Sequence, residues 1–421
     1  MPTTPKSPNV SRRRFLKRVG IAGSVFGVLG LAGWSQWPQA GVLNPCRIGL
    51  PPELVRHPLM TKIWSGLAPS KVWDMHAHLV GVGDSASGAW ANPKMDSLWN
   101  PFQYLQKIFY MNAGCVHNAP GQIDASFVAR LEKLMDDFPA GAQTLLYAFD
   151  WAHDEQGRPL REVSAFHVPN AYAAKVAHAH PTRMQWAASI HPYRKDALAA
   201  LEQAVAEGAK AMKWLPAAMG IDPDSRKCDA FYQLLAKHDL PLITHAGHEA
   251  AVAGSARQDY GNPLKVRRAL DMGVRVVIAH CASHGDDLDH AGKTRASFDI
   301  LADMLDAKIP GEFSNLYADI SAVTQFNRAK TLQTLLSRPE WHNKLLNGSD
   351  YPLPGILPLT SLSKLVNLGL LSAETTPFLI GLREHNPLLF DFALKRLLRW
   401  KGEKFANSVF ETSGFFDHHS H

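Results

Sequence analysis

Residues 72–78, Val-Trp-Asp-Met-His-Ala-His, open the repeating pattern that decides the fold of this 421-residue chain. From there on, short apolar or β-branched runs alternate with longer stretches that have the three-to-four-residue spacing of amphipathic helices, as in residues 196–207 and 230–238. The short runs are predicted strands, and there are eight of them: residues 72–78, 144–149, 184–190, 209–215, 241–245, 274–280, 316–320 and 344–347.

Strands that alternate with helices are typical of an α/β fold with a parallel sheet. Eight units favour a closed (β/α)8 TIM barrel over an open Rossmann sheet, and no G-x-G-x-x-G motif follows the first strand to indicate dinucleotide binding. We expect one barrel domain over residues 71–400, with a lead-in at 41–70 and a tail at 401–421. Residues 79–121, rich in Gly, Ser, Asn and Trp, form a long insertion expected at the top of the barrel. Residues 384–398 are predicted to form a C-terminal helix.

Two histidines stand at the end of the first predicted strand. His76 and His78 are two positions apart, so on an extended strand both side chains point to the same face. Neutral imidazoles placed in this way can hold one metal ion. An H-x-H pair on an amphipathic strand is also found as a purely structural feature, so the pair alone does not establish a site.

Four further polar residues mark the ends of later strands. Lys213, His245 and His280 end the fourth, fifth and sixth, and Asp350 follows the eighth. Their separations are 32, 35 and 70 residues, and one unit of a ~250-residue barrel takes ~31 residues. A buried histidine bonded to backbone would explain any one of them. The regular placement instead predicts convergence at the carboxyl ends of the strands, where histidines and a carboxylate suit zinc or another divalent metal.

Five motifs occur in order: D-M-H-A-H, G-A-K-A-M-K-W-L-P, P-L-I-T-H, V-V-I-A-H and N-G-S-D-Y-P, beginning at residues 74, 208, 241, 276 and 347. Over residues 71–395 the chain resembles the amidohydrolase superfamily, in particular the amidohydrolase-related group that includes metal-dependent decarboxylases. The resemblance implies that His76, His78, His245 and Asp350 bind metal. It implies that His280 binds a second metal or orients the substrate.

The resemblance leaves two states for Lys213. In binuclear members the corresponding lysine is N-carboxylated and bridges two ions, whereas single-metal members also keep a lysine there. A free ammonium is repelled by a divalent cation, while a carbamate is an anionic oxygen ligand. A lysine that extends outward or pairs with an acidic substrate is the other interpretation.

The implied activity is metal-dependent hydrolysis of a small ester, lactone or amide. Water activated by the metal would give its proton to Asp350, and His280 would polarise the substrate carbonyl. A decarboxylase is the first alternative, and it would need an arginine near the pocket to bind a carboxylate. The sequence does not place Arg161, Arg257 or Arg383 there. A non-catalytic envelope binding protein is the second. Residues after the strand ends are further candidates for substrate contacts: His248, Glu249, His284, Asp150 and His191.

The N-terminus has the layout of an export signal. Residues 11–17, Ser-Arg-Arg-Arg-Phe-Leu-Lys, precede an apolar run at residues 19–34, as in twin-arginine signals. We therefore expect residues 1–40 to engage the twin-arginine translocase and the protein to be periplasmic. The 16-residue run is shorter than the ~20 residues of a spanning helix. A membrane anchor remains the alternative if the signal is not cleaved.

Composition narrows the class of partner. Hydrophobic residues make up 46% of the chain and charged residues 19%, as in folded proteins. The net charge of +6 is carried by the first 40 residues, so nothing favours a nucleic-acid partner over a small-molecule substrate. Four cysteines at positions 46, 115, 228 and 281 lack C-x-x-C spacing, which argues against a zinc knuckle. One disulfide after export fits this spacing, without an assigned pair.

Overall fold

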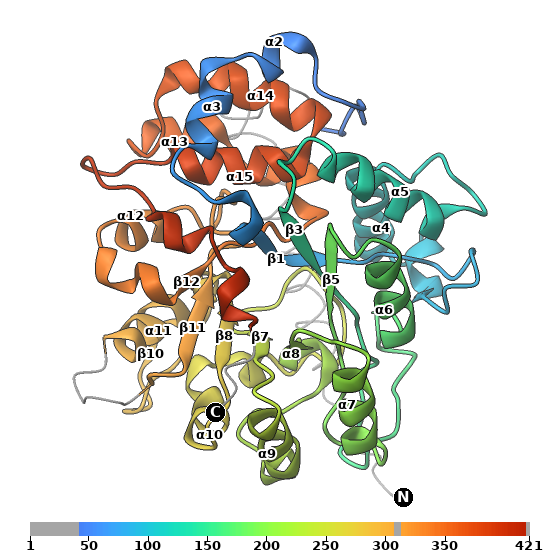
Figure 1. The fold of residues 1–421 in the computed structure, drawn as a ribbon. Helices are drawn as coiled ribbons and strands as arrows, with labels where there is room; N and C mark the ends of the chain where they lie inside the picture. Colours follow the sequence, from blue (N-terminus) through green and yellow to red (C-terminus); the bar gives the residue numbers. More distant parts are fainter. Residues whose placement is uncertain (1–41, 307–312, 418–421) are drawn as a thin grey trace, which may run out of the picture.

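A barrel of parallel strands forms the centre of the molecule (Figure 1). The computed structural model describes residues 42–306 and 313–417. Each barrel strand overlaps one of the eight predicted runs, which confirms the predicted fold class. In chain order the strands are β1 (Trp73–His78), β3 (Gln143–Tyr147), β5 (Met184–Ala187), β6 (Met212–Trp214), β7 (Leu242–His245), β8 (Val276–Ala279), β11 (Leu316–Asp319) and β12 (Leu345–Leu346).

The strands close into a ring through two short junctions. Regular pairing gives a three-stranded sheet, β1-β3-β5, and a five-stranded sheet, β12-β11-β8-β7-β6. A parallel bridge between Ala188 and Met212 joins β5 to β6, and a second between Ala77 and Tyr351 joins β1 to the segment after β12. At the second junction the amide of His78 donates to the carbonyl of Tyr351 at 2.8 Å. The backbone hydrogen bonds therefore run round the whole barrel.

Helices surround the barrel because its strands are apolar on both faces and need cover outside as well as inside. In α7, for example, Ala197, Leu201 and Ala204 are buried on one face. The predicted helices at 196–207 and 230–238 are α7 and α9. The surrounding helices are α6 (Asn170–Ala179), α7 (Ala197–Ala206), α8 (Pro216–Met219), α9 (Asp229–Lys237), α10 (Arg267–Asp271), α11 (Ser297–Leu305), α12 (Thr331–Leu336) and α13 (Leu362–Asn367).

Two pairs of helices pack together at one side of the barrel, seen at the top of Figure 1. The lead-in forms α2 (Pro52–Val55) and α3 (Pro58–Trp64), which contact α14 (Thr376–His385) and α15 (Pro387–Leu397). The prediction of one helix over 384–398 was wrong at its start. Asn386 is extended and Pro387 lacks an amide hydrogen, so one helix ends there and another begins.

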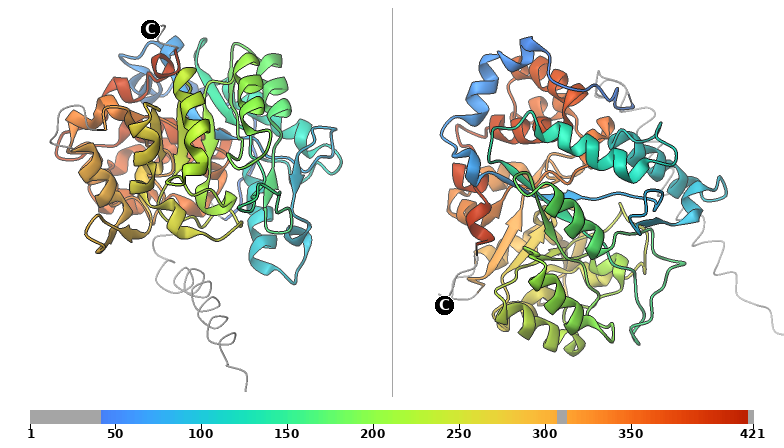
Figure 2. Two further views of the ribbon diagram at one scale, coloured as in Figure 1. Left: turned by 90° about the horizontal axis from the view of Figure 1, so that it is seen from below. Right: turned by 45° about the vertical axis from the view of Figure 1, so that its right-hand side comes forward.

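The insertion after β1 carries its own elements. It contains β2 (Trp90–Ala91), which pairs antiparallel with β4 (Phe166–His167), and α4 (Pro101–Ala113); α5 (Ile123–Met135) follows. Both views of Figure 2 show this region projecting from the rim of the molecule. A second hairpin is formed by β9 (Asp286–Leu288) and β10 (Thr294–Ala296).

A disulfide joins the lead-in to the insertion. Cys46 is bonded to Cys115, while Cys228 and Cys281 are free and buried. The sequence had left this pairing open.

The C-terminal tail closes the amino end of the barrel. Phe416 is buried and stacks on Trp73 at a ring distance of 5.4 Å, within the interior cluster that includes Met75, Ile243 and Val277. The aperiodic tail therefore completes the core. No described helix is long and apolar enough to cross a bilayer. The predicted signal segment lies outside the described residues.

Candidate metal centre

A pocket at the carboxyl ends of the strands collects the polar residues predicted from the sequence. Its walls are apolar, with Phe149, Phe166 and Leu215 among them, and part of the insertion reaches it through Tyr110 of α4. The polar side chains that line it are His76, His78, Lys213, His245, Glu249, His280 and Asp350.

The carboxylate of Asp350 lies at the centre of this group. Its Oδ1 is 3.1 Å from Nε2 of His78 and 3.5 Å from Nε2 of His76, and its Oδ2 is 3.9 Å from Nε2 of His280. The ligand atoms of His76, His78 and Asp350 all lie within 4.8 Å of one another. Nε2 of His76 is buried and has no hydrogen-bond partner among the described residues. A buried nitrogen aimed at a carboxylate and two imidazoles fits a metal ligand.

Asp319, at the end of β11, holds two of these histidines and was not singled out from the sequence. Its Oδ2 accepts a hydrogen bond from Nδ1 of His76 at 2.9 Å, and its Oδ1 accepts one from the amide of His280 at 3.0 Å. Protonation of Nδ1 leaves the lone pair of His76 on Nε2, facing the site. The sequence signal that could have identified Asp319 was a carboxylate at the end of an otherwise apolar run, in the position that the other candidate residues occupy on their strands.

His245 lies in the pocket but outside this close group. Its ring is 5.4 Å from that of His280, its Nε2 is 3.3 Å from Oε2 of Glu249, and its Nδ1 is buried without a partner in the described chain. Oε1 of Glu249 accepts hydrogen bonds from the amides of Ala251 and Val252, which fixes the carboxylate. Burial raises the pKa of Glu249. Glu249 is therefore part of the centre, as is His245, the ligand predicted from the sequence.

Three histidines of the centre, His76, His245 and His280, favour the neutral form. Burial is the largest cause of a lowered pKa for each, followed by the charge of Lys213 at His76, of Arg328 at His245 and of the His76 imidazole at His280. Neutral imidazole is the form that binds a metal ion.

Lys213 is buried beside the histidines without an anion of its own. Within the described residues its Nζ has no hydrogen-bond partner, and it lies 4.9 Å from the ring centre of Tyr147. Burial lowers the pKa of Lys213 to about 8. The lowered pKa increases the fraction of neutral amine, the form that reacts with carbon dioxide, relative to an exposed lysine.

Several centre residues have an unusual backbone. Asp350 has φ = 63°, and His280, Cys281 and Ala282 have φ of 56°, 50° and 45°. Left-handed conformations are costly for such residues and gather at functional sites. Asp350 is held there by its own amide, which donates to the carbonyl of His76 at 2.7 Å.

Four other predicted candidates lie outside the pocket lining. His248 and His284 face each other at 5.7 Å on the loops after β7 and β8. Asp150 accepts hydrogen bonds from the amide of His191 and from the guanidinium of Arg194, and so ties neighbouring loops together.

Arg328, on the loop after β11, is the cation near the centre that sequence reasoning missed. Its Nη1 donates to Oγ of Ser283 at 3.2 Å, while its Nε is buried and unpartnered among the described residues. The three arginines considered from the sequence lie elsewhere: Arg161 over Trp151, Arg257 paired with Asp259, and Arg383 bonded to the carbonyl of Thr360.

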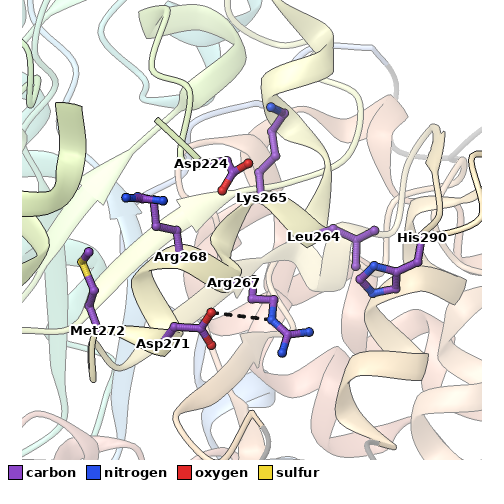
Figure 3. A pocket seen from close by; sticks show the side chains of 8 residues that line it. All are labelled: Asp224, Leu264, Lys265, Arg267, Arg268, Asp271, Met272 and His290. Atoms are coloured by element: carbon purple, nitrogen blue, oxygen red, sulfur yellow. Dashed lines mark ion pairs between the residues drawn. The ribbon is translucent and has the colours of Figure 1, made fainter. Parts of the chain in front are cut away.

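A second hollow lies outside the barrel beside α10 (Figure 3). Its two arginines are already paired: Arg267 with Asp271 at 3.6 Å, and Arg268 with Asp229 at 2.5 Å. Among the described residues that line this hollow, none has a buried side-chain nitrogen without a hydrogen-bond partner, unlike those of the centre.

The chain is similar to several solved structures and matches one family model. Similar solved structures include an uncharacterised TIM-barrel protein from Bordetella bronchiseptica (17% identity, TM-score 0.45, covering 70% of this chain and 90% of that one). A second is 5-carboxyvanillate decarboxylase from Sphingomonas paucimobilis (11% identity, TM-score 0.42, covering 74% of this chain and 97% of that one). A third is 4-oxalomesaconate hydratase from Rhodopseudomonas palustris (15% identity, TM-score 0.39, covering 77% of this chain and 98% of that one). No curated protein matches. The family model described as amidohydrolase matches residues 73–356, from the first barrel strand to beyond Asp350, and the chain belongs to this family.

Proposed function

We propose that this protein is a metal-dependent hydrolase that cleaves a small ester, lactone or amide. One observation carries the proposal: the buried, unpartnered Nε2 of His76 lies 3.5 Å from the Asp350 carboxylate, within the group completed by His78. These three residues, with His245, would hold a divalent ion such as zinc. A second ion would need His280 and an N-carboxylated Lys213.

When bound, the ion supplies Lewis acidity that lowers the pKa of water and polarises a carbonyl. Asp350 takes up the proton of the attacking water and returns it to the leaving group, since its carboxylate lines the pocket and faces the Nε2 atoms of three histidines. The apolar walls exclude bulk water from the reaction. Phe149, Phe166 and Leu215 contribute to that wall.

Hydrogen bonds support a role for His280 as a metal ligand. Ser321 Oγ makes a short hydrogen bond to Oδ1 of Asp319 and so acts as a donor there. Oγ of Ser321 can then accept from Nδ1 of His280, which lies 2.7 Å away. This leaves the lone pair of His280 on Nε2, facing Asp350, and favours a metal ligand over a hydrogen-bond donor to the substrate.

The proposal is tested by assaying the zinc-loaded protein against panels of lactones, esters and amides. We expect turnover of at least one class, and a loss of kcat of at least about a thousandfold in Asp350→Asn without a change in the unfolding midpoint. Wild-type kinetics in that variant would contradict the proposed role of the carboxylate.

A decarboxylase is the second candidate, and Arg328 favours it. The Arg328 guanidinium, whose Nε is buried, has no carboxylate within ion-pair distance among the described residues, although its charge reaches Glu249 and Asp350. A substrate carboxylate would supply the missing anion. Release of carbon dioxide from carboxylated aromatics, with KM raised in Arg328→Gln, would establish this reaction in place of hydrolysis.

We also propose export through the twin-arginine translocase. The basic motif at residues 11–17 and the disulfide between Cys46 and Cys115 support passage to an oxidising compartment. Replacing Arg12 and Arg13 by lysine should retain the protein in the cytoplasm on cell fractionation, and unchanged export would refute this route.

A further inference from the structure

Exposed apolar side chains are concentrated in two segments of the molecule. Of the eleven large hydrophobic residues exposed in the described chain, eight lie in residues 42–48 or 98–108, and the other three, Val55, Leu198 and Leu288, lie elsewhere. The eight are Val42, Leu43, Ile48, Leu98, Trp99, Phe102, Leu105 and Ile108. Contiguous exposed apolar surface of this kind marks an interaction site.

The second segment presents one face of α4 and the turn before it. Phe102, Leu105 and Ile108 follow one another at three-residue spacing, so they form a stripe along the helix. Before the helix, Leu98 is 75% exposed and Trp99 is 95% exposed. We call residues 98–108 with these exposed side chains the α4 face. In Figure 2 this part of the chain projects from the rim.

The opposite side of α4 belongs to the pocket. The hydroxyl of Tyr110 donates to the carbonyl of Ala251 at 2.6 Å, and Nε2 of Gln106 donates to the same carbonyl at 3.1 Å. Ala251 and Tyr110 both line the candidate metal centre. Whatever binds the α4 face therefore lies next to a wall of the pocket.

The two exposed segments are fixed to each other. The disulfide between Cys46 and Cys115 joins the lead-in to the residues just after α4, and the amide of Asn44 donates to Oδ1 of Asn112 at 2.8 Å. The described chain, which starts at residue 42, is therefore tied to the end of α4 through Asn44 and Cys46. The apolar run at 19–34 ends eight residues earlier, a separation that spans at most ~28 Å.

We propose that the α4 face docks the protein onto the surface of a lipid bilayer. Residues 97–106 contain no Asp, Glu, Lys or Arg, and the two charges that flank them, Asp96 and Lys107, pair with each other at 2.6 Å. The exposed apolar side chains can therefore enter the interface without taking an unpaired charge out of water. Tryptophan, phenylalanine and leucine on one face of a helix are typical of segments that lie in the membrane interface. The N-terminal basic and apolar residues would bring a bilayer within reach of this face before any cleavage.

A second copy of the chain is the competing occupant. A stable dimer buries about 800 Å² on each partner and requires matching shape. The α4 face is a projecting edge. Such an edge inserts into a deformable lipid bilayer more readily than it matches the fixed surface of a second protein. The bilayer is therefore the occupant that the geometry favours.

The test follows the fluorescence of Trp99 in the full-length chain bound to vesicles of phosphatidylethanolamine and phosphatidylglycerol. Brominated acyl chains quench only tryptophans that touch the apolar interior, and the difference between wild type and Trp99→Phe isolates this residue. Anchoring through residues 19–34 alone would give no Trp99 signal. We expect clear Trp99 quenching in wild type.

Three variants decide the result. Leu98→Ser/Phe102→Ser/Leu105→Ser keeps the reporter, and its Trp99 quenching should fall by at least about fivefold when the apolar contacts are removed. Leu198→Ser/Leu288→Ser, which changes exposed leucines elsewhere, should match wild type. Absence of Trp99 quenching in vesicle-bound wild type would overturn the proposal. A wild-type dimer that becomes monomeric in the triple variant in sedimentation would overturn it in favour of a second copy.

Discussion

At the scale of single residues, the candidate centre depends on groups that hold the ligands as well as on the ligands themselves. The buried carboxylate of Asp319 accepts hydrogen bonds from Nδ1 of His76 and from the backbone amide of His280. The sequence pointed to His76, His78 and Asp350 through their strand-end positions. For Asp319 the sequence held only the signal of a carboxylate at the end of an apolar run. It held none for Arg328, whose importance arises from partners far away in the chain.

Removing the charge of Asp319 should weaken metal binding. Asp319→Asn keeps the size of the side chain but loses the anionic acceptor of the His76 Nδ1 hydrogen bond, so we expect metal affinity to fall by about 10- to 100-fold. Competition with a fluorescent chelator measures this. Asp299→Asn, at an exposed position, is the matched control. Equal affinities for the two variants would show that Asp319 does not orient the centre.

Lys213 gives a prediction about pH. In the metal-free protein its pKa falls from 10.5 to about 8 because of burial. Between these values the unfolded chain binds the proton and the folded chain does not, so stability rises with pH in this window. Lys213→Met should therefore stabilise the metal-free protein by up to about 3 kcal/mol below pH 8 and lose that advantage towards pH 10.5. Urea unfolding across pH 7–10 measures the effect.

The exposed Lys404→Met is the control for that series, because its ammonium stays in water in both states. A difference between Lys213→Met and wild type that does not vary with pH would contradict a buried, titrating lysine.

At the scale of elements, the junction between β1 and the segment after β12 places the ligands. Gly348 passes so close to β1 that an added Cβ would lie 2.4 Å from Cβ of His76. The carbonyl of Gly348 also accepts a hydrogen bond from the buried Nζ of Lys395 in α15 at 2.6 Å. The close approach of Gly348 to His76 therefore both closes the barrel and positions the residues of the centre.

Gly348→Ala should separate these segments. We expect the free energy of unfolding to fall by about 1–3 kcal/mol through overpacking, with weaker metal binding because His76 moves. Gly414→Ala adds the same methyl group where no atom lies within 4 Å, and should leave both quantities unchanged. Wild-type stability and metal affinity in Gly348→Ala would contradict the close approach.

The same elements show what the sequence could predict. All eight barrel strands were predicted, because a strand buried on both faces is a continuous apolar run bounded by polar residues. The division between α14 and α15 was missed, since the apolar pattern continues across Asn386 and Pro387 and only the proline marks the break. The pairing of Cys46 with Cys115 depends on how the lead-in folds back, which periodicity does not encode.

At the scale of the whole molecule, one end of the barrel is closed and the other carries the chemistry. Phe416 of the tail completes the interior at the amino end. At the carboxyl end, the insertion covers the pocket with one side of α4 and presents exposed apolar residues on the other. The family assignment fits this division, since the family model spans the barrel and the centre.

Binding of a divalent metal at the carboxyl end of the barrel can be measured directly by elemental analysis of protein produced with zinc available. The comparison is His76→Ala/His78→Ala, chosen for an unchanged circular dichroism spectrum. We expect about one to two equivalents of metal in the wild type and close to none in the double variant. A folded wild type without metal, or a double variant that retains the full amount, would contradict metal binding at this end of the barrel.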